Sequence, residues 1–336
     1  MVRVAILSYW HVHAKDYARM AAEHPQTEIA ALWDENPQRG RQKAEELGVP
    51  FFEALPELLA NPDIDAVIVV TPTTQHREVL IAAAAAGKHI FTEKVVATTT
   101  KACNEILAAV ETAGIKLVVS LPRLYTGFTQ AAQRLIQGGD LGTVTTVRIR
   151  LAHNGALPTD ASPNGSLPAH FFDPLESGGG AMIDLGCHPM YLARLFLGLP
   201  ERVSAGYGSI MGRQVEDSAV TIMHYANGAL GIVEAGFVNS YSQFNIEVQG
   251  TEGSLLYDRS DNKLLMRKSG GPALWQEVTE MPEAVPTAFE MWVSHIQQGT
   301  TATENIALAR DLTRLMEASN LSAQSGAAYR LSDLSE

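Results

Sequence analysis

The sequence predicts an α/β protein with two domains: a doubly wound parallel sheet over residues 1–121 and an α+β domain over residues 122–336, with a mostly antiparallel, open sheet. Three observations support this fold class. The chain has 336 residues, of which 46% are hydrophobic and 18% charged, so it is long enough to bury two cores. Short apolar runs alternate with helical patterns in the first third. Alternating strand patterns dominate the remainder.

The first domain consists of short apolar runs that are each followed by a helical pattern. Runs rich in Val and Ile between helices are typical of strands buried on both faces, and repeated strand–helix–strand units predict a right-handed, doubly wound sheet. The apolar runs are VRVAIL, EIAALWD, DAVIVVT, HIFTEK and IKLVVS. Helices are expected through Tyr17 and Met20, over 37–47, from about 75 to 86 and from about 99 to 113.

The second domain begins with one helix, at about 127–138, and then changes to strands. A loop rich in Pro, Gly and Ser covers 154–180, and a further helix is expected at about 184–197. The strands SAVTIMHY and ALGIVEAGF are joined by Asn227-Gly228, which can supply the positive φ of a tight hairpin. The other strands are TVTTVRIRLAH, FNIEVQG, SLLYD and KLLMRK, and helices at about 287–298 and 303–323 complete the domain.

The partners expected from the sequence are a small molecule and further copies of the chain. The formal charge of −12 and the pI near 5.3 argue against binding to nucleic acid or to an anionic membrane surface, because phosphates would be repelled. The open sheet needs a cover, because its alternating strands leave apolar side chains on two faces. A partner subunit is the simplest cover, which predicts a homodimer or homotetramer.

Two isolated cysteines, Cys103 and Cys187, form no CxxC pair. Lone thiols favour a reducing compartment over a disulfide framework. The N-terminus lacks a basic segment followed by an apolar core and a cleavage site, and no apolar run approaches the roughly 18 residues of a membrane span. These features predict a cytoplasmic protein.

The stretch SYWHVHA, residues 8–14, lies where the first strand of a dinucleotide-binding domain runs into its helix. Glycines are expected there because they let the backbone approach a pyrophosphate, and this stretch has none. Free N–H groups, the helix dipole and the side chains of Ser8, His11 and His13 can still attract phosphates. The alternative is that Trp10, His11 and His13 fill the cofactor site. No metal is expected, because no third ligand with recognisable zinc spacing is nearby.

Asp34 closes the run EIAALWD, 26 positions after Ser8. A carboxylate at this strand end can accept hydrogen bonds from both hydroxyls of an adenosine ribose and repel a 2′-phosphate. This placement favours NAD over NADP. The alternative is a helix N-cap, because Asp34 directly precedes ENPQRGR.

Two further segments, TPTTQH (71–76) and GKHIFTEK (87–94), leave the carboxyl ends of neighbouring predicted strands. Ligands bind at this edge of open parallel sheets, so residues in both segments are candidates for a binding site. Each segment also has a structural interpretation, because Thr-Pro is a common helix start and a single Lys is usually a solvated charge.

The stretch GGGAMIDLGCHPMY, residues 178–191, places Asp184 and His188 four positions apart, so on a helix they share one face. A His beside a carboxylate can take or give a hydroxyl proton, and the preceding glycines allow the backbone to approach a ligand closely. The alternative for an isolated Asp-x-x-x-His is an ion pair on a helix surface.

Together, the patterns TPxxxH, GKH followed by EK, and GGGAxxDxGxH resemble the Gfo/Idh/MocA family of glucose-fructose oxidoreductase, inositol dehydrogenase and rhizopine catabolism proteins. DLGTVTTVRIR and VQGTEGSLLYD resemble further family segments, so the resemblance covers nearly the whole chain. It implies a Rossmann domain followed by an open-sheet domain, and NAD(P)-dependent oxidation of a secondary hydroxyl of a sugar, inositol or related polyol. Two alternatives stay open: NAD-dependent glycoside hydrolysis through transient oxidation, and ligand binding without catalysis.

The resemblance also implies roles for individual residues. Lys94 matches the Lys of the family's Glu-Lys-Pro motif, which contacts the reacting oxygen, while His188 matches the proton-transferring histidine and Asp184 its companion acid. In the implied mechanism His188 removes the hydroxyl proton, the carbinol hydride passes to the nicotinamide, and Lys94 stabilises the developing alkoxide. The positions around the nicotinamide and its ribose are Thr71, Pro72, His76 and Glu93, and those of the first loop are Ser8, Trp10, His11 and His13.

Three departures from the family pattern are visible. Val95 stands where the family has a proline that often follows a cis bond, and since a non-proline cis bond costs roughly 3 kcal/mol, we expect a trans peptide and a displaced lysine. Tyr191 replaces the usual aspartate, which should affect helix packing or substrate contact more than proton transfer. In the glycine-free loop, either Ser8, Trp10 and His13 take the three glycine positions, or His13 matches a family histidine and the loop is shorter.

The substrate pocket is expected between the domains. Its walls should include Arg123 and Tyr125 after the last Rossmann strand, His153 at a strand end, and the HFFDP stretch (170–174) with His170 and Asp173, in addition to Lys94 and His188. Polar groups on aromatic walls suit a polyhydroxylated ring. The alternatives are that HFFDP is a packed loop and that Arg123 pairs with a local acid.

Overall fold

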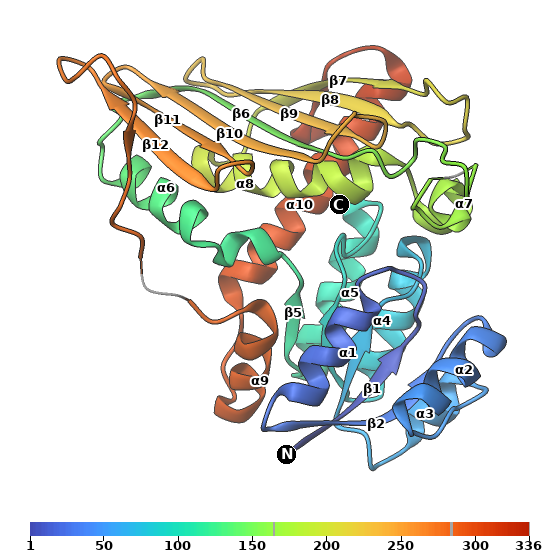
Figure 1. Ribbon diagram of the computed structural model, residues 1–336. Coiled ribbons are helices and arrows are strands. Elements are labelled where there is room, and N and C mark those ends of the chain that lie inside the picture. The colour runs from blue at the N-terminus through green and yellow to red at the C-terminus, as the bar shows by residue number, and fades with distance from the viewer. Residues whose placement is uncertain (164, 283–284, 336) are drawn as a thin grey trace. The chain divides into compact units, whose positions relative to one another are not determined.

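The computed structural model describes residues 1–163, 165–282 and 285–335 (Figure 1). The chain divides into two compact units. The first contains residues 1–121 and 286–310, and the second contains residues 122–285 and 311–335. The division after residue 121 lies at the expected domain boundary, whereas the segment 286–310 belongs with the first unit.

The first unit is built on a five-stranded parallel sheet with the strand order β2-β1-β3-β4-β5, so the predicted doubly wound sheet is confirmed. Its central strands are buried on both faces, and all four residues of β3 have no exposed surface. The strands are β1 (Val2–Leu7), β2 (Thr27–Trp33), β3 (Ala66–Val69), β4 (His89–Thr92) and β5 (Leu117–Val119). The helices between them are α1 (Ala14–Glu23), α2 (Pro37–Leu47), α3 (Leu55–Ala60), α4 (His76–Ala85), which follows the short helix η1 (Thr73–Gln75), and α5 (Thr100–Ala113).

The strand order places the ligand-binding edge of this sheet. The chain passes from β1 to β2 on one side and returns to β3 on the other side of β1. The carboxyl ends of β1 and β3 therefore flank the topological switch point, where open α/β sheets bind ligands. The glycine-free stretch SYWHVHA connects β1 to α1 at this point.

Helix α9 (Ala288–Gln298) packs against the first unit although it follows the second in sequence. The rings of Phe289 and Trp292 lie 5.5 and 5.6 Å from the ring of Phe91 on β4. Near the start of α10 (Thr303–Ser325), the Asn305 side chain accepts a hydrogen bond from the Val119 N–H at 2.8 Å and donates to the Val119 carbonyl at 2.9 Å. These buried contacts explain why residues 286–310 join the first unit.

The second unit contains a nine-stranded sheet with the order β13-β12-β11-β10-β6-β9-β8-β7-β14. Every pair is antiparallel except β6 and β9, so the predicted mostly antiparallel sheet is confirmed. In the β8–β9 hairpin, Gly228 alone supplies the expected positive φ. The strands are β6 (Val144–Ala152), β7 (Arg202–Gly208), β8 (Ser218–His224), β9 (Leu230–Gly236), β10 (Gln243–Gly250), β11 (Gly253–Asp258), β12 (Lys263–Lys268), β13 (Gln276–Glu277) and β14 (Tyr329–Arg330).

Helices cover one face of this sheet. Helices α6 (Gly127–Gln137) and α8 (Cys187–Leu197) lie along it, and buried side chains such as Val147 and Ile149 of β6 alternate with more exposed neighbours (Figure 1). The uncovered face is mixed rather than uniformly apolar, because Glu234 pairs there with arginines of β6 at 2.8 and 3.0 Å. The remaining helical elements of this unit are η2 (Pro122–Tyr125), η3 (Ala169–Phe172), α7 (Pro174–Ser177), the π-helical turn η4 (Met182–Gly186) and η5 (Leu331–Asp333).

Across the part of the chain that the structure describes, no helix combines the length and the apolar character that a membrane crossing requires. Both cysteines are buried free thiols.

Candidate functional site

Ser8 takes the backbone conformation that a glycine would take after β1. Its φ is +80°, in the left-handed region that is rare for residues with a side chain. The Ser8 hydroxyl oxygen accepts a hydrogen bond from the Trp10 N–H at 2.9 Å, which offsets part of the conformational cost. The loop has therefore lost its glycines but keeps a glycine-like turn at the first position.

A charged cluster lies at the carboxyl end of β4, next to this loop. Nδ1 of His13 is 3.5 Å from Oε2 of Glu93, and the Tyr17 hydroxyl donates a hydrogen bond to the same oxygen. Nζ of Lys94 lies 3.6 Å from Oε1 of Glu93. Burial alone would raise the pKa of Glu93, but the charges of His11, His13 and Lys94 hold it well below its usual range. Glu93 is thus a buried, ionised carboxylate.

Glu93 lies near His11 and His13 as a third ligand-type side chain, which the residue spacing in the sequence did not reveal. Glu93 brings its carboxylate to both, and the ligand-type atoms of the three residues lie within 4.8 Å of one another. Parallel pairing of strands that are distant in sequence makes this proximity invisible to residue spacing. Nδ1 of His11 accepts the His13 N–H at 3.2 Å, and Lys94 already balances the Glu93 charge, so the cluster has the geometry of a hydrogen-bonded network.

Asp34 lies at the end of β2 with its side chain buried. Its carboxylate accepts hydrogen bonds from the N–H groups of Tyr9 and Asn36, both at 2.8 Å. Arg39 adds two more, from Nε at 2.9 Å and from Nη2 at 2.7 Å. The alternative of an Asp34 N-cap is wrong, because the Asn36 side chain caps α2. Arg39 therefore pairs with the carboxylate that was expected to bind the ribose, and it was not among the residues singled out from the sequence.

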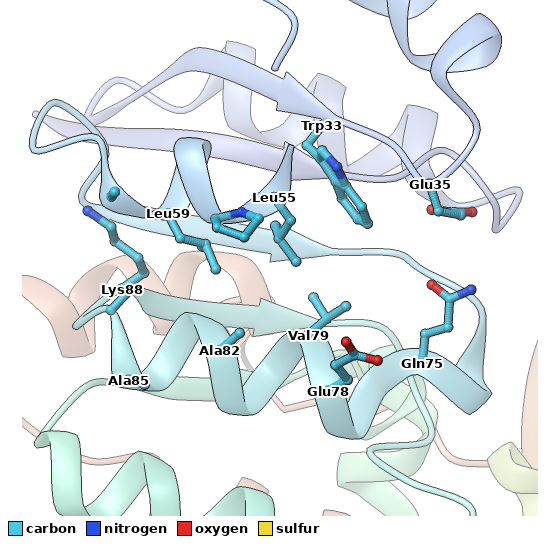
Figure 2. Close-up of a pocket in the computed structure, with 13 residues that line it drawn as sticks. Trp33, Glu35, Leu55, Leu59, Gln75, Glu78, Val79, Ala82, Ala85 and Lys88 are labelled. Atoms are coloured by element: carbon cyan, nitrogen blue, oxygen red, sulfur yellow. The ribbon is translucent and has the colours of Figure 1, made fainter. Parts of the chain in front are cut away.

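A groove of about 1020 Å³ opens beside this strand end, between α3 and α4 (Figure 2). Trp33, Glu35 and Gln75 surround one end, and Leu55, Leu59 and the alanines of α4 line its length. At the other end, Lys88 donates from Nζ to the carbonyls of Asn61 and Ile64 at 2.9 and 2.7 Å. The Trp33 end of the groove adjoins the carboxyl end of β2 and also holds Glu35 and Gln75.

Three polar residues of the TPTTQH segment after β3 are buried: Thr71, Thr73 and His76. The Thr71 hydroxyl is buried and has no hydrogen-bond partner among the described residues. Pro72 immediately precedes the short helix η1. His76 has no exposed surface, burial lowers its pKa, and its Nδ1 lies 2.8 Å from the carbonyl oxygen of Val95. His76 therefore supports the Glu93–Val95 segment from within the unit.

The expectation of a trans peptide before Val95 is wrong, because the Lys94–Val95 bond is cis. Val95 has no exposed surface, and its carbonyl oxygen faces His76.

The second unit holds the GGG segment and the catalytic pair implied by the resemblance. The glycine run approaches another part of the chain rather than being left free for a ligand: the Glu216 carboxylate accepts hydrogen bonds from the N–H groups of Gly180 and Met182, both at 2.9 Å. A Cβ at Gly180 would collide with the Glu216 carbonyl oxygen. The sequence carried no signal for Glu216.

Asp184 lies in a π-helical turn, Met182–Gly186, and His188 lies in the first turn of α8, which follows it directly. His188 is buried, and its Nδ1 lies 3.2 Å from the Tyr191 hydroxyl. That hydroxyl also accepts the Arg123 N–H at 3.0 Å. The charge of Asp184 acts on His153, whose pKa burial lowers and Asp184 partly restores. Tyr191 thus stands beside His188 in the place of the family's aspartate.

The other expected wall residues have mixed environments. His153 stacks on Phe237 at 5.3 Å, and Tyr125 ends the short helix η2. In the HFFDP stretch, Phe171 is buried and the Asp173 side chain caps α7. His170 lies in the same loop, in η3. Arg123 has no carboxylate partner among the described residues, so the alternative of pairing with a local acid is not observed.

Comparisons with known proteins identify the family. A model described as an oxidoreductase family with an NAD-binding Rossmann fold matches residues 2–121, and a Gfo/Idh/MocA C-terminal domain model matches residues 129–256. The scyllo-inositol 2-dehydrogenase (NAD(+)) of Bacillus subtilis (strain 168) is 31% identical over 265 residues, which is 76% of this chain and 73% of the relative. The 1,5-anhydro-D-fructose reductase of Ensifer adhaerens is 29% identical and covers 68% of each chain.

A solved structure supports the same fold. Levoglucosan dehydrogenase in complex with NADH superposes with a TM-score of 0.83 at 22% identity, over 98% of this chain and 99% of its own. The first unit is accordingly an NAD-binding Rossmann domain. The chain is an oxidoreductase and belongs to the Gfo/Idh/MocA family.

Proposed function

We propose that this enzyme oxidises a secondary hydroxyl of a sugar, an inositol or a related polyol and transfers the hydride to NAD. The relatives named above act on an inositol and on an anhydro sugar. The observation that carries the proposal is Lys94, a buried ammonium at the carboxyl end of β4, next to the switch point of the sheet. A buried cation at this edge can stabilise the oxyanion that develops as a hydroxyl loses its proton.

The strand edge of the first unit fits a dinucleotide. Ser8 holds the turn that brings backbone N–H groups to the start of α1, and the buried, unpartnered Thr71 hydroxyl can bond a ligand. The Trp33 end of the α3–α4 groove suits an adenine ring (Figure 2). Bound NAD supplies a nicotinamide that accepts a hydride.

Asp34 and Arg39 act on cofactor choice in opposite directions. The Asp34 and Glu35 carboxylates repel a 2′-phosphate, whereas the Arg39 guanidinium, paired with both, attracts it. We expect NAD to bind more tightly than NADP, with Arg39 releasing Asp34 to the ribose hydroxyls. Calorimetry should show this preference, and Asp34→Ala should narrow it. Equal or tighter binding of NADP by the wild-type protein would refute the assignment.

In the second unit, His188 serves as the proton acceptor, and Tyr191 orients its ring through the contact at Nδ1. The ring nitrogen Nε2 is then the atom that faces the hydroxyl. Asp184 acts through its charge, which raises the pKa of His153. The proposed substrate contacts are Arg123, Tyr125, His153, His170 and Asp173.

An NADH absorbance assay across inositols, aldoses, uronic acids and glycosides tests the function. We expect at least one compound to reduce NAD, and Lys94→Met to abolish most of that activity while the protein stays folded. Hydrolysis of glycosides without net NADH would instead indicate redox-assisted cleavage, and NAD binding without turnover of any compound would contradict the proposed dehydrogenase.

Two broader expectations accompany the function. The uncovered face of the second unit's sheet, with Val220 and Leu230 each more than a third exposed, would be buried in a homodimer or homotetramer. Light scattering tests this, and a monomer of 36.3 kDa would refute it. The two buried free thiols fit a cytoplasmic enzyme.

A further inference from the structure

Arg123, in η2, is a half-buried cation to which the described residues supply no carboxylate partner. Its guanidinium carbon lies 4.0 Å from the ring centroid of Phe244. Its Nε is buried and has no hydrogen-bond partner among the described residues, and none of their carboxylates lies within ion-pair distance. An uncompensated buried charge is costly, so proteins normally pair such a group or use it to bind a ligand.

The groups around Arg123 do not balance the charge of its guanidinium. Burial lowers the pKa of Arg123, and the nearby Arg259 lowers it further. The other groups that act on it are the side chains of Tyr191, Tyr257 and Cys187. Burial raises the pKa of Tyr257, so this phenol stays neutral and cannot balance a guanidinium. No carboxylate is among the groups that act on Arg123, whereas Asp258 and Asp261 act on the neighbouring Tyr257.

Two other arginines that stack on phenylalanine rings show what pairing looks like in this protein. Arg213 lies 3.9 Å from the Phe172 ring centroid and donates to the carbonyls of Ala156 and Pro163 at 3.0 and 3.2 Å. Arg41 lies over Phe51 and pairs with Glu53 at 2.6 Å. Stacking on an aromatic ring therefore does not by itself explain a guanidinium without oxygen partners.

Arg123 is also tied to the proposed proton acceptor. Its backbone N–H donates to the Tyr191 hydroxyl at 3.0 Å, and that hydroxyl lies 3.2 Å from Nδ1 of His188. The Tyr191 side chain thus links the backbone of Arg123 to the buried imidazole of His188. A ligand group bound by the guanidinium would lie in the same unit as His188.

We propose that Arg123 binds an oxyanion substituent of the substrate, so that the physiological substrate is an acidic sugar rather than a neutral one. The inference rests on the proposed function, because it names the substrate class of that site. A guanidinium presents parallel N–H donors that match a carboxylate or phosphate, and Arg259 adds to the positive potential. A uronic or aldonic acid offers a carboxylate, and a sugar phosphate offers the same oxyanion chemistry.

The test compares matched neutral and anionic sugars. Wild-type protein, Arg123→Met and Arg123→Lys are assayed with glucose, glucuronate, gluconate and glucose 6-phosphate, and with galactose and galacturonate. We expect the wild-type kcat/KM to be higher for an anionic member, and Arg123→Met to reduce this preference over the neutral partner roughly 10- to 100-fold. Arg123→Lys should lie between. Preference for the carboxylates or for the phosphate identifies the oxyanion.

Arg41→Met is the matched control, because it removes a ring-stacked arginine that already has a carboxylate partner. It should leave the anionic preference unchanged. If Arg123→Met fails to fold, Arg123→Lys still tests the proposal, because it keeps the charge and loses the paired donors. Calorimetry of glucuronate and glucose 6-phosphate against the NAD-loaded enzyme gives a readout that does not depend on turnover.

The failure of this inference differs from that of the proposed function. If neutral sugars reduce NAD as well as their acidic counterparts, or Arg123→Met lowers both activities by one factor, the oxyanion site is refuted while the dehydrogenase stands. If no sugar is oxidised, the function fails, and weaker binding of glucuronate or glucose 6-phosphate by Arg123→Met alone would then support the anion site. Absence of binding by either anion would overturn it.

Discussion

The two histidine-bearing segments of this chain have different partners. In the first unit, His11 and His13 face the buried carboxylate of Glu93. In the second, His188 contacts the phenol of Tyr191. A carboxylate stabilises a protonated imidazole, whereas a neutral phenol holds the ring without favouring its charged form. The first pair therefore suits the binding of an anionic cofactor, and the second suits proton acceptance.

The largest expected effect comes from removing His188, the proposed proton acceptor. His188→Ala should lower kcat roughly 10²–10⁴-fold, the usual contribution of a positioned general base, with little change in NAD affinity. His13→Ala should do the reverse and weaken NAD binding more than kcat. Steady-state kinetics and calorimetry on both variants measure the split. Wild-type turnover by His188→Ala would remove the distinction between the two segments.

Glu93→Gln tests the charge of the first cluster. Removing one partner from a buried charge network should lower the melting temperature at pH 7 by roughly 5–10 °C. Because the folded-state pKa of Glu93 is lowered, its stabilisation is present above the unfolded value of about 4.3 and is lost as the pH falls through the folded value. The difference between wild type and variant should therefore shrink below about pH 4. A constant difference across that range would show that Glu93 contributes by packing alone.

Tyr191→Phe should have a smaller effect on catalysis. The variant keeps the ring that packs in α8 and removes only the hydroxyl that contacts His188 and accepts the Arg123 N–H. We expect kcat to fall about fivefold, with unchanged KM for NAD, since one buried hydrogen bond contributes about 1 kcal/mol. Tyr191→Asp, which restores the family residue, should recover part of the loss. Equal losses in both variants, with lowered melting temperatures, would indicate a packing role only.

Much of the fold was accessible from the sequence because its signals are local. The Val-rich runs and the helix 37–47, which the structure reproduces as Pro37–Leu47, follow from burial and periodicity. The placement of α9 in the first unit was not accessible from the sequence. Phe289 and Trp292 pack on Phe91, which lies about 200 positions away, and such a contact leaves no local pattern.

The site was predictable to the extent that a motif fixed it. Asp34, Lys94 and His188 lie on the expected elements, whereas their partners came from elsewhere in the chain. Arg39 follows Asp34 by five residues, and a basic residue at that distance was a usable signal. Tyr17, which follows His13 at helical spacing, was another. Glu216 and the π-helical turn had none, because both depend on tertiary contacts of the GGG segment.

The smallest expected effect is that of restoring a glycine to the first loop. Ser8 already has a φ of +80°, so Ser8→Gly changes the side chain without changing the shape of the turn. Glycine relieves roughly 1–2 kcal/mol of conformational cost, but it loses the hydrogen bond to the Trp10 N–H, about 1 kcal/mol, and gains freedom in the unfolded chain. These terms nearly cancel, so the melting temperature should change little, and the Kd for NAD should stay within about threefold. Ser8→Ala is the matched control: it loses the hydrogen bond and keeps the strain, so it should be the less stable of the two. A Kd for NAD that decreases more than about tenfold in Ser8→Gly would mean that the Ser8 side chain limits cofactor binding. The partners of His11 and His13 would then not set the affinity, and the contrast between the two histidine-bearing segments would need a different cause.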